Sequence, residues 1–383
     1  MSEINGLNRI KGSPKQVFIR TPLLHSAPLS NLASKCGKRV DVYLKMEALQ
    51  PSGSFKVRGL GNSILKAYDS TKGPFHIISS SGGNAGLAAA YCAREMEEQC
   101  TIFVPSTCEE FVKDLLRAEG ANVIVAGAAW DECDIAAKEL LQKEKSAGRM
   151  AYYVHPFEGE DTVEGHSTMM DEIFQQLQEV GVRNGRPDIV TCSAGGCGLL
   201  RGVMRGIQRA FSQDLPQVIV TQTFGANSLG SSITQARSKG QSWDDKDVVQ
   251  VSLPAITSKA TSLGAKTCSL QAVKEGLRYG DKLSSLIIED RMAEDGAWRF
   301  AQDHRLLVEL ACSCVLAPIY HSKRILSKLL SGPNTESDEP IVMVVIVCGG
   351  NKINTEMIEQ YRLESGKEPD LKNRKVTIDG ASI

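Results

Sequence analysis

The sequence predicts an α/β fold with mostly parallel sheets, arranged as two lobes. Apolar, strand-like runs alternate with helix-like stretches from about Arg39 to Cys348, which is typical of parallel βαβ units. A chain of 383 residues can bury a large core, and this length favours two domains over one. Examples of the strand-like runs are residues 100–104, 122–125 and 218–221.

Composition excludes several classes of protein. The 44 Lys and Arg residues nearly balance 45 Asp and Glu, so no nucleic-acid partner is expected. No apolar run is long enough to cross a bilayer, and residues 1–16 lack the apolar core of a signal peptide. The eleven cysteines are scattered and odd in number, without zinc-site spacing. We therefore expect reduced thiols, a cytoplasmic location and no membrane partner.

The segment 51–59, Pro-Ser-Gly-Ser-Phe-Lys-Val-Arg-Gly, places a lysine at the start of a predicted helix. The preceding residues 42–46 alternate like a strand. Partial burial there would lower the pKa of the Lys56 amine and prepare it to form a Schiff base with an aldehyde cofactor. A solvated helix lysine is the ordinary alternative.

The next segment, Ser79 to Gly86, lies between an apolar run and a helix-like stretch. It predicts a strand, a tight polar loop and a helix N-terminus, whose backbone N–H groups can bind a carboxylate. Asn84 adds an amide that can donate to a carboxylate or phenolate oxygen. An ordinary glycine-rich turn remains the alternative.

A second glycine-rich loop, Cys192 to Leu200, follows the strand-like run 188–190. Its glycines allow close approach of the backbone to a phosphate, and the following helix contributes its dipole. The loop lacks the Gly-Lys-Ser/Thr of a Walker motif and the acidic residue of a dinucleotide site.

A buried strand is predicted at residues 343–347, and it ends in Cys348 and two glycines. Ligands of open α/β sheets lie beyond the carboxyl ends of the strands. A neutral thiol at this point could hydrogen-bond a pyridine nitrogen without protonating it, although a structural cysteine is the commoner case.

Taken in this order, the four segments resemble the fold-type II pyridoxal phosphate enzymes of the tryptophan synthase β group. Within that group they look most like the catabolic L-serine/L-threonine dehydratases. The resemblance covers roughly residues 18–360, and its specific pieces are Ser-Gly-Ser-Phe-Lys and Ser-Gly-Gly-Asn-Ala-Gly. Supporting pieces are residues 21–23, 153–157, 164–166, 256–258 and 263–264.

The resemblance implies two lobes, each an open, mostly parallel sheet flanked by helices, with the cofactor between them. The large cofactor-binding domain would comprise residues 1–57 and 151–383, and the small domain residues 58–150. A homodimer is also implied. Only 33 residues follow Gly350, too few for the regulatory domain of biosynthetic threonine deaminases, so the catabolic type is favoured.

The resemblance also assigns roles to residues. Lys56 would form the Schiff base and, once released by the substrate amine, remove the proton from Cα. Phe55 would stack near the ring of the cofactor, and Cys348 would contact its nitrogen. The implied phosphate loop is Gly195, Gly196, Cys197, Gly198 and Leu199. The implied substrate-carboxylate loop is Ser81, Gly82, Gly83, Asn84 and Ala85, of which Asn84 would also contact the cofactor.

Position 82 separates activities within the family. Racemases carry a serine there as a second base on the opposite face of Cα, whereas this chain has Gly82. Racemization is therefore not expected.

Other positions depart from the family pattern. Gln222 stands where glutamate usually helps to bind K⁺ or Mg²⁺, together with the backbone carbonyls of Ala226, Leu263 and Ala265. A glutamine would keep an oxygen ligand but lose the negative charge, so we expect a weakened cation site. Cys197 replaces a glycine, and the segment 309–314 differs from Glu-Pro-Ala-Cys-Gly-Ala at Leu310, Ser313 and Cys314.

Three functions are consistent with these residues. The favoured one is β-elimination of L-serine, with L-threonine as a further substrate, to pyruvate or 2-oxobutyrate and ammonia. The altered residues leave open a specialised lyase or β-replacement enzyme acting on another β-substituted amino acid. A catalytically degenerate paralogue is the third, disfavoured by the presence of Lys56, Asn84 and Cys348.

Overall fold

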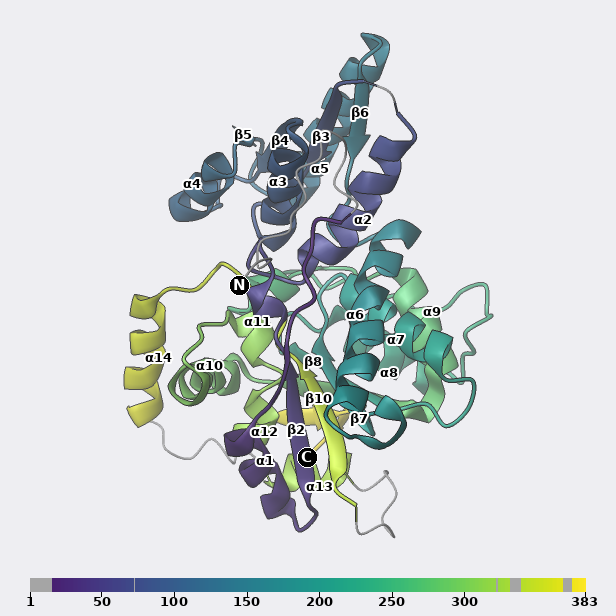
Figure 1. The fold of residues 1–383 in the computed structure, drawn as a ribbon, viewed down its shortest axis with the longest axis vertical. Coiled ribbons are helices and arrows are strands. Elements are labelled where there is room, and N and C mark those ends of the chain that lie inside the picture. The colour runs from purple at the N-terminus through teal and green to yellow at the C-terminus, as the bar shows by residue number, and fades with distance from the viewer. Residues whose placement is uncertain (1–15, 72, 322, 331–338, 368–373) are drawn as a thin grey trace, which may run out of the picture. The chain divides into compact units, whose positions relative to one another are not determined.

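The computed structural model describes residues 16–383 except 72, 322, 331–338 and 368–373. Helices and strands alternate along most of this chain, as the sequence predicts (Figure 1). The strands are β1 (Leu23–His25), β2 (Val40–Lys45), β3 (Phe75–Ser79), β4 (Gln99–Val104), β5 (Asn122–Val125), β6 (Met150–Tyr153), β7 (Ile189–Ser193), β8 (Gln217–Thr223), β9 (Leu283–Ile288), β10 (Ile341–Ile346), β11 (Val376–Ile378) and β12 (Ala381–Ser382).

The α-helices differ widely in length, and the longest is α6. They are α1 (Ala27–Ala33), α2 (Lys56–Asp69), α3 (Asn84–Met96), α4 (Glu110–Ala118), α5 (Trp130–Ser146), α6 (Glu160–Glu179), α7 (Gly198–Ala210), α8 (Ser228–Ser238), α9 (Leu270–Tyr279), α10 (Asp290–His304), α11 (Leu310–Ser313), α12 (Ala317–His321), α13 (Lys323–Leu329) and α14 (Thr355–Lys367). Short 3₁₀ helices are η1 (Ser34–Cys36), η2 (Glu47–Leu49), η3 (Arg183–Gly185), η4 (Thr261–Leu263) and η5 (Gly280–Lys282).

The chain divides into two compact units. Unit 1 contains Met1–Ile19 and Gln50–His166, and unit 2 contains Arg20–Leu49 and Ser167–Ile383. These boundaries differ from the expected ones, 1–57 with 151–383 and 58–150. The difference arises partly because β6 pairs with β3 and so belongs to unit 1. Lys56 therefore lies in unit 1, and the assignment of cofactor binding to the larger domain stays a prediction.

Unit 1 is built on a four-stranded sheet in the order β5-β4-β3-β6, and its strands all run parallel. The first strand of this sheet along the chain is β3. Strands β4 and β5 are added on one side of it, and β6 is then added on its other side. The order of the strands therefore reverses between β3 and β6. In open α/β sheets, the loops at the carboxyl ends of such a pair diverge and leave room for a ligand.

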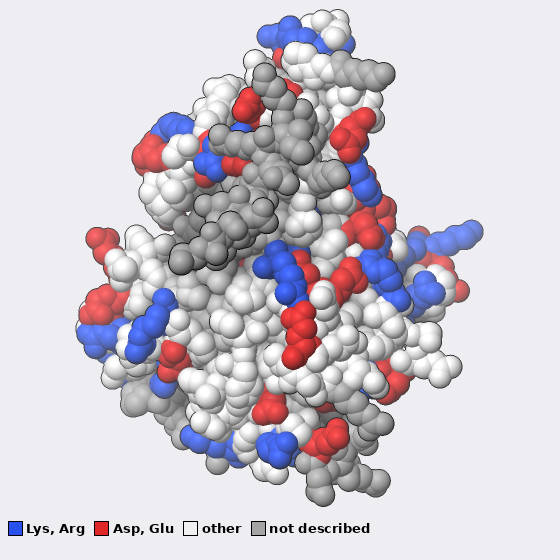
Figure 2. All heavy atoms as spheres, viewed as in Figure 1, with Lys and Arg blue, Asp and Glu red and all other residues white. Residues whose placement is uncertain are grey.

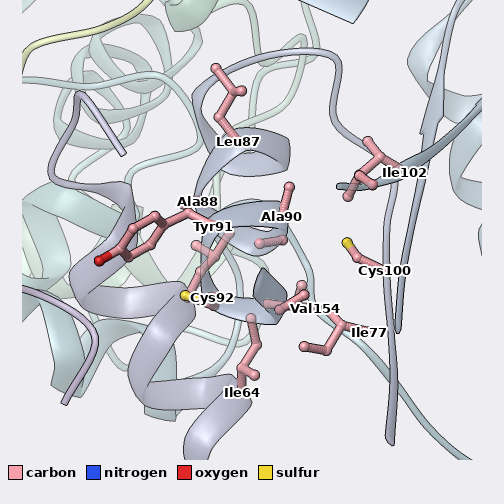
Figure 3. Close-up of a cluster of buried hydrophobic side chains, with 14 of the residues drawn as sticks. Ile64, Ile77, Leu87, Ala88, Ala90, Tyr91, Cys92, Cys100, Ile102 and Val154 are labelled. Atoms are coloured by element: carbon pink, nitrogen blue, oxygen red, sulfur yellow. The ribbon is translucent and has the colours of Figure 1, made fainter. Parts of the chain in front are cut away.

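The core of unit 1 lies where α2 and α3 pack together beside the sheet (Figure 3). Ile64 comes from α2, Ile77 from β3 and Ile102 from β4, and all three side chains are fully buried. Helix α3 faces them with small residues, which include Ala88 and Ala90. Because alanine side chains are short, the two helices can approach closely, and the apolar contact supports the α2 N-terminus that carries Lys56.

Unit 2 is built on an eight-stranded sheet in the order β1-β2-β10-β7-β8-β9-β11-β12. The strands from β2 to β9 in this order are parallel, while β1, β11 and β12 are antiparallel to their neighbours. After β7 the chain adds β8 and β9 on one side, and β10 then returns to the other side of β7. The reversal in unit 2 therefore lies between β7 and β10.

Helices cover both faces of the unit 2 sheet (Figure 1). Helices α7 and α8 contact α9 on one side, and α10 contacts α11, α12 and α14 on the other. Strands β9 and β10 are buried along their whole length, as expected for strands covered on both faces. The predicted α/β class with mostly parallel sheets is confirmed.

On the face drawn in Figure 2, Lys and Arg side chains are interspersed with Asp and Glu side chains. Among the helices of the described residues, none is long and apolar enough to span a membrane. All eleven cysteines lie in described residues, and none of them forms a disulfide in the structure.

The core of unit 1 makes a prediction about stability. Replacing the fully buried Ile64 with alanine should lower the free energy of unfolding by about 2–5 kcal/mol, because a cavity opens between α2 and α3. Ile135 in α5 is 57% exposed, and its replacement by alanine should change stability by only about 0.5 kcal/mol. Urea unfolding of both variants measures the difference, and equal losses would contradict the described packing.

Candidate active site

Lys56 is the first residue of α2, directly after a tight turn. Gly53 adopts φ +73° in this turn, a conformation that favours glycine, and its N–H donates to the Gln50 carbonyl oxygen at 2.7 Å. The Lys56 side chain is half-buried, and its Nζ donates to the Pro156 carbonyl oxygen at 2.7 Å. Its Nζ also lies 5.2 Å from the centre of the Phe55 ring. The predicted partial burial of this amine is therefore observed.

The start of α6 packs closely against α2 and limits where Lys56 can lie. A Cβ on Gly165 would lie 2.8 Å from the Cα of Gly59, so glycine permits this approach. His166 is fully buried with its ring centre 4.9 Å from that of Phe55, and neither ring nitrogen has a hydrogen-bond partner among the described residues. Burial, with the nearby charges of Lys56 and Arg58, holds the pKa of His166 well below its usual value. His166 is therefore a neutral ring.

His155 lies in the loop after β6, next to Pro156. Its Nδ1 accepts hydrogen bonds from the N–H groups of Phe157 and Glu158, at 3.3 and 3.0 Å. Burial lowers the pKa of His155 to about 4. A neutral His155 thus fixes the loop whose Pro156 carbonyl holds the Lys56 amine.

The predicted loop from Ser81 to Gly83 follows β3, and Asn84 begins α3. Ser80 Oγ lies 2.8 Å from Tyr153 Oη, and Ser79 Oγ donates to the Val154 carbonyl oxygen at 3.1 Å. These bonds join the carboxyl ends of β3 and β6. Asn84 and Ala85 are nearly fully buried at the helix N-terminus, where backbone N–H groups lack helical acceptors. The structure therefore brings this loop and the Lys56 acceptor to the same reversal of strand order.

Gly82 lies against Cys108. A Cβ at position 82 would lie 2.8 Å from Cys108 Sγ and 3.3 Å from Val104 Cγ1. Cys108 Sγ in turn lies 3.7 Å from the Gly82 carbonyl oxygen. A side chain at position 82 therefore requires Cys108 to move, which adds a steric reason to the absence of a second base.

In unit 2, the predicted phosphate loop follows β7 and leads into α7. A Cβ on Gly195 would lie 2.9 Å from the Cα of Leu263, so only glycine lets the loop pass this close to its neighbour. Gly198 and Leu199 begin α7, so their backbone N–H groups lack helical acceptors and can bind an anion. Gly196 lies between these two features, in the part of the loop that would cradle a phosphate.

Cys197 departs from its usual glycine at a demanding position. It adopts φ +76° directly before α7, in the left-handed region where a side chain costs roughly 1–2 kcal/mol. Its thiol lies 3.2 Å from the Gly195 carbonyl oxygen and hydrogen-bonds Cys268, which lowers the pKa of the Cys268 thiol. These contacts offset part of the strain.

Cys348 lies two residues beyond the end of β10, and 5% of its surface is exposed. Its Sγ lies 3.7 Å from the Oγ of Ser193, the last residue of β7. Burial, followed by a hydrogen bond with Cys348, raises the pKa of the neighbouring Cys312 thiol. The thiol at position 348 therefore lies beside the end of β7, where the predicted phosphate loop begins, at the reversal of strand order in unit 2.

The residues of the expected cation site do not present the expected oxygen ligands. Gln222 turns its amide nitrogen, not its oxygen, toward the Ala226 carbonyl oxygen, at 3.1 Å. The Gln222 Oε1 accepts instead from the Gly230 N–H at 2.9 Å, and the Ala265 carbonyl oxygen accepts from Ser228 Oγ at 2.9 Å. The Leu263 carbonyl oxygen accepts from the Ala265 N–H at 2.8 Å. These four residues do not fit a K⁺ or Mg²⁺ ion, because a protein N–H stands where the expectation placed an oxygen ligand.

Sequence reasoning missed three groups in these two loop systems. They are the Pro156 carbonyl, the Cys108 side chain and the Ser193 hydroxyl. The first and third lie in segments that carry the family resemblance. Cys108 is brought to Gly82 only by the tertiary fold, and no local pattern marks it.

The protein is a two-domain α/β protein. Each unit has an open sheet with a glycine-rich loop at the point where the order of the strands reverses. The half-buried lysine of unit 1 and the glycine-rich loop after β7 in unit 2 agree with the family that the sequence resembles. Residues 15–349 match the family described as "Pyridoxal-phosphate dependent enzyme". The chain belongs to this family, and pyridoxal phosphate is its cofactor.

Named relatives match over almost the whole chain. An L-serine dehydratase of Dictyostelium discoideum is 36% identical over 353 residues, which is 91% of this chain and 93% of that protein. A human protein named L-serine dehydratase/L-threonine deaminase is 36% identical over 354 residues, covering 92% and 97%.

Solved structures agree on the fold. A fungal L-serine ammonia-lyase from Rhizomucor miehei has a TM-score of 0.76 at 30% identity, covering 91% of this chain and 99% of that one. Maize serine racemase has a TM-score of 0.69 at 20% identity, covering 92% and 94%. The predicted two-lobed, fold-type II architecture is confirmed. An ammonia-lyase and a racemase share this fold, so the fold does not distinguish elimination from racemization. Only the residues of the site can distinguish the two reactions.

The Gly82–Cys108 contact makes a prediction. Gly82→Ser should lower stability by about 1–3 kcal/mol, because the added side chain overpacks the space beside Cys108. Combining it with Cys108→Ala should recover most of that loss, and Cys108→Ala alone is the control. Urea unfolding measures the stabilities of the three variants and the parent. A Gly82→Ser variant as stable as the parent protein would contradict the described contact.

Proposed function

We propose that this protein eliminates water from L-serine, and from L-threonine, by pyridoxal phosphate-dependent catalysis. Loss of the Cα proton and the β-hydroxyl gives an enamine and water. The enamine then tautomerises and is hydrolysed, so that the products are pyruvate or 2-oxobutyrate and ammonia. The observation that carries this proposal is the 36% identity, over nine-tenths of both chains, to a protein named L-serine dehydratase.

The residues present fit the cofactor. Two observations support this: the half-buried Lys56 amine and the loop in which Gly195 has no room for a Cβ. When bound, pyridoxal phosphate supplies an aldehyde that combines with amines and a ring that accepts electrons from Cα. We propose that Lys56, Phe55, residues 195–199 and Cys348 are the residues that bind it.

The residues of unit 1 then act on the substrate. Lys56 Nζ removes the proton from Cα, and the Pro156 carbonyl oxygen is an acceptor for the protonated amine. Ser81, Asn84 and the N–H groups at the α3 N-terminus bind the substrate carboxylate, with Gly82, Gly83 and Ala85 allowing its approach. Gly82 places no proton donor beside the substrate, which favours elimination over inversion.

In unit 2, the N–H groups of residues 195–199 bind the phosphate, and Cys348 contacts the ring nitrogen. A thiol there is a neutral partner, in contrast to a carboxylate, so the ring is a weaker electron acceptor. This suits a reaction in which the β-hydroxyl leaves as the Cα proton is removed.

A specialised relative acting on another β-substituted amino acid is the second candidate. The altered residues Cys197, Gln222 and Cys314 motivate it. All three belong to unit 2, and none is part of the loop 81–85 proposed for the substrate carboxylate. The departures therefore concern how the cofactor is held, and L-serine remains the favoured substrate.

We also propose that the protein is a homodimer in the cytoplasm. Eleven free cysteines support a reducing compartment. The dimer follows from the family resemblance.

The proposed reaction has a direct test. The protein with bound cofactor should release equal amounts of keto acid and ammonia from L-serine. Lys56→Ala should lower the rate by about 10³-fold or more, because no other group is proposed to remove the Cα proton. Lys66→Ala, on the exposed side of the same helix, should keep the parent rate. Borohydride followed by peptide mass spectrometry should place the cofactor on Lys56.

Keto acid release from another β-substituted amino acid, with none from L-serine, would favour the specialised relative. If no amino acid tested changes the absorbance spectrum of the bound cofactor, the degenerate paralogue would be favoured. Full activity of Lys56→Ala would refute the assignment of the base.

A further inference from the structure

Gln222 is a fully buried polar residue near the end of β8, and its side chain makes three hydrogen bonds. Its Nε2 donates to the carbonyl oxygens of Ala194 and Ala226, at 2.8 and 3.1 Å. Its Oε1 accepts from the N–H of Gly230 at 2.9 Å. A buried amide can make at most four such bonds, so nearly its full capacity is used.

The three partners determine which way the amide points. Two of them are carbonyl oxygens, which only accept, and the third is an N–H, which only donates. The opposite orientation of the Gln222 amide would place its oxygen against two carbonyl oxygens and its nitrogen against an N–H. That arrangement would leave every one of these groups unsatisfied in the core, so the assigned orientation is the stable one.

The partners connect the phosphate loop to the next βα turn. Ala194 directly precedes Gly195, and its N–H donates to the Thr221 carbonyl oxygen at 3.3 Å. Gly230 lies in the first turn of α8, where its N–H lacks a helical acceptor. A Cβ on Gly230 would lie 3.4 Å from Gln222 Oε1, so the amide is closely enclosed. Gln222 therefore holds the beginning of the phosphate loop against a fixed helix end.

We propose that Gln222 is a positioning residue for the phosphate loop and that its two N–H donors do the work of a bound cation. The carbonyl oxygens of Ala194 and Ala226 converge on a single point, where either a cation or N–H donors must balance their partial negative charge. The amide supplies the donors, so the enzyme needs neither K⁺ nor Mg²⁺ at this point. This inference rests on the proposed function, in that residues 195–199 bind the cofactor phosphate.

A glutamate at position 222 would leave the two carbonyl oxygens without N–H donors. It matches glutamine in shape, but it removes both donors and places a negative charge beside two carbonyl oxygens. An isolated buried carboxylate is costly, and a cluster of carboxylate and carbonyl oxygens is the ligand set that hard cations prefer. Gln222→Glu should therefore create a cation requirement that the parent protein lacks.

The first experiment uses the parent protein alone. Pyridoxal phosphate affinity and the melting temperature of the apoprotein are measured in potassium, magnesium and tetramethylammonium chloride at equal ionic strength. We expect affinities that agree within about twofold, because no cation is bound at the loop. A parent protein whose cofactor affinity or apoprotein melting temperature rises specifically with potassium or magnesium would overturn the proposal.

The second experiment compares three variants. In tetramethylammonium, Gln222→Glu should bind the cofactor about tenfold or more weakly, because buried groups lose their partners. Potassium or magnesium should restore its affinity and raise its apoprotein melting temperature. Gln222→Met, which has no donors and no charge, should bind weakly in every salt. Gln235→Glu, an exposed position on α8, is the control for added charge and should match the parent.

Parent-like affinity of either Gln222→Glu or Gln222→Met in tetramethylammonium would refute the positioning role. If Gln222→Glu does not fold, the salt series on the parent protein and the affinity of Gln222→Met still test whether Gln222 positions the loop without a cation. Failure of the parent protein to bind pyridoxal phosphate in every salt would instead refute the proposed function. The apoprotein melting temperatures would then still test whether Gln222 replaces a cation.

Discussion

The order in which parallel strands are added after β3 in unit 1 and after β7 in unit 2 reverses once in each sheet, and this reversal determines where the polar loops gather. In unit 1 it lies between β3 and β6, and in unit 2 between β7 and β10. Loops that leave neighbouring strands in opposite directions open a space at the carboxyl ends. Ser80 and Tyr153 meet at the first reversal, and Ser193 and Cys348 meet at the second. The candidate residues of each unit therefore follow from topology before any chemistry is considered.

Close packing holds these loops in place, and glycine makes the packing possible. Gly59 and Gly165 let α2 and α6 touch, which supports the position of Lys56. Gly195 lets the phosphate loop pass Leu263. Desolvation keeps the buried histidines near Lys56 neutral, so neither ring adds a positive charge beside the amine.

The departures from the family pattern have physical consequences that differ from one another. Cys197 occupies a backbone conformation suited to glycine, and its thiol contacts offset part of the cost. Gln222 replaces a charge with a neutral amide that donates to the carbonyl oxygens of Ala194 and Ala226. Both changes preserve the loop that we propose for the phosphate. They alter how it is held, and they leave the loop after β3 unchanged.

The sequence by itself determined the α/β class, because alternating apolar runs and helix-like stretches are local patterns. It also indicated Lys56, the two glycine-rich loops and Cys348 as candidate site residues, since each lies in a short motif near a strand end. Only the tertiary structure decided the pairing of β6 with β3, the contact of Cys108 with Gly82 and the orientation of the Gln222 amide. The first two depend on residues far apart in the chain, and the third depends in part on Ala194, 28 residues before Gln222. A side-chain amide has both a donor and an acceptor, so its role at position 222 is set by the partners that folding brings to it.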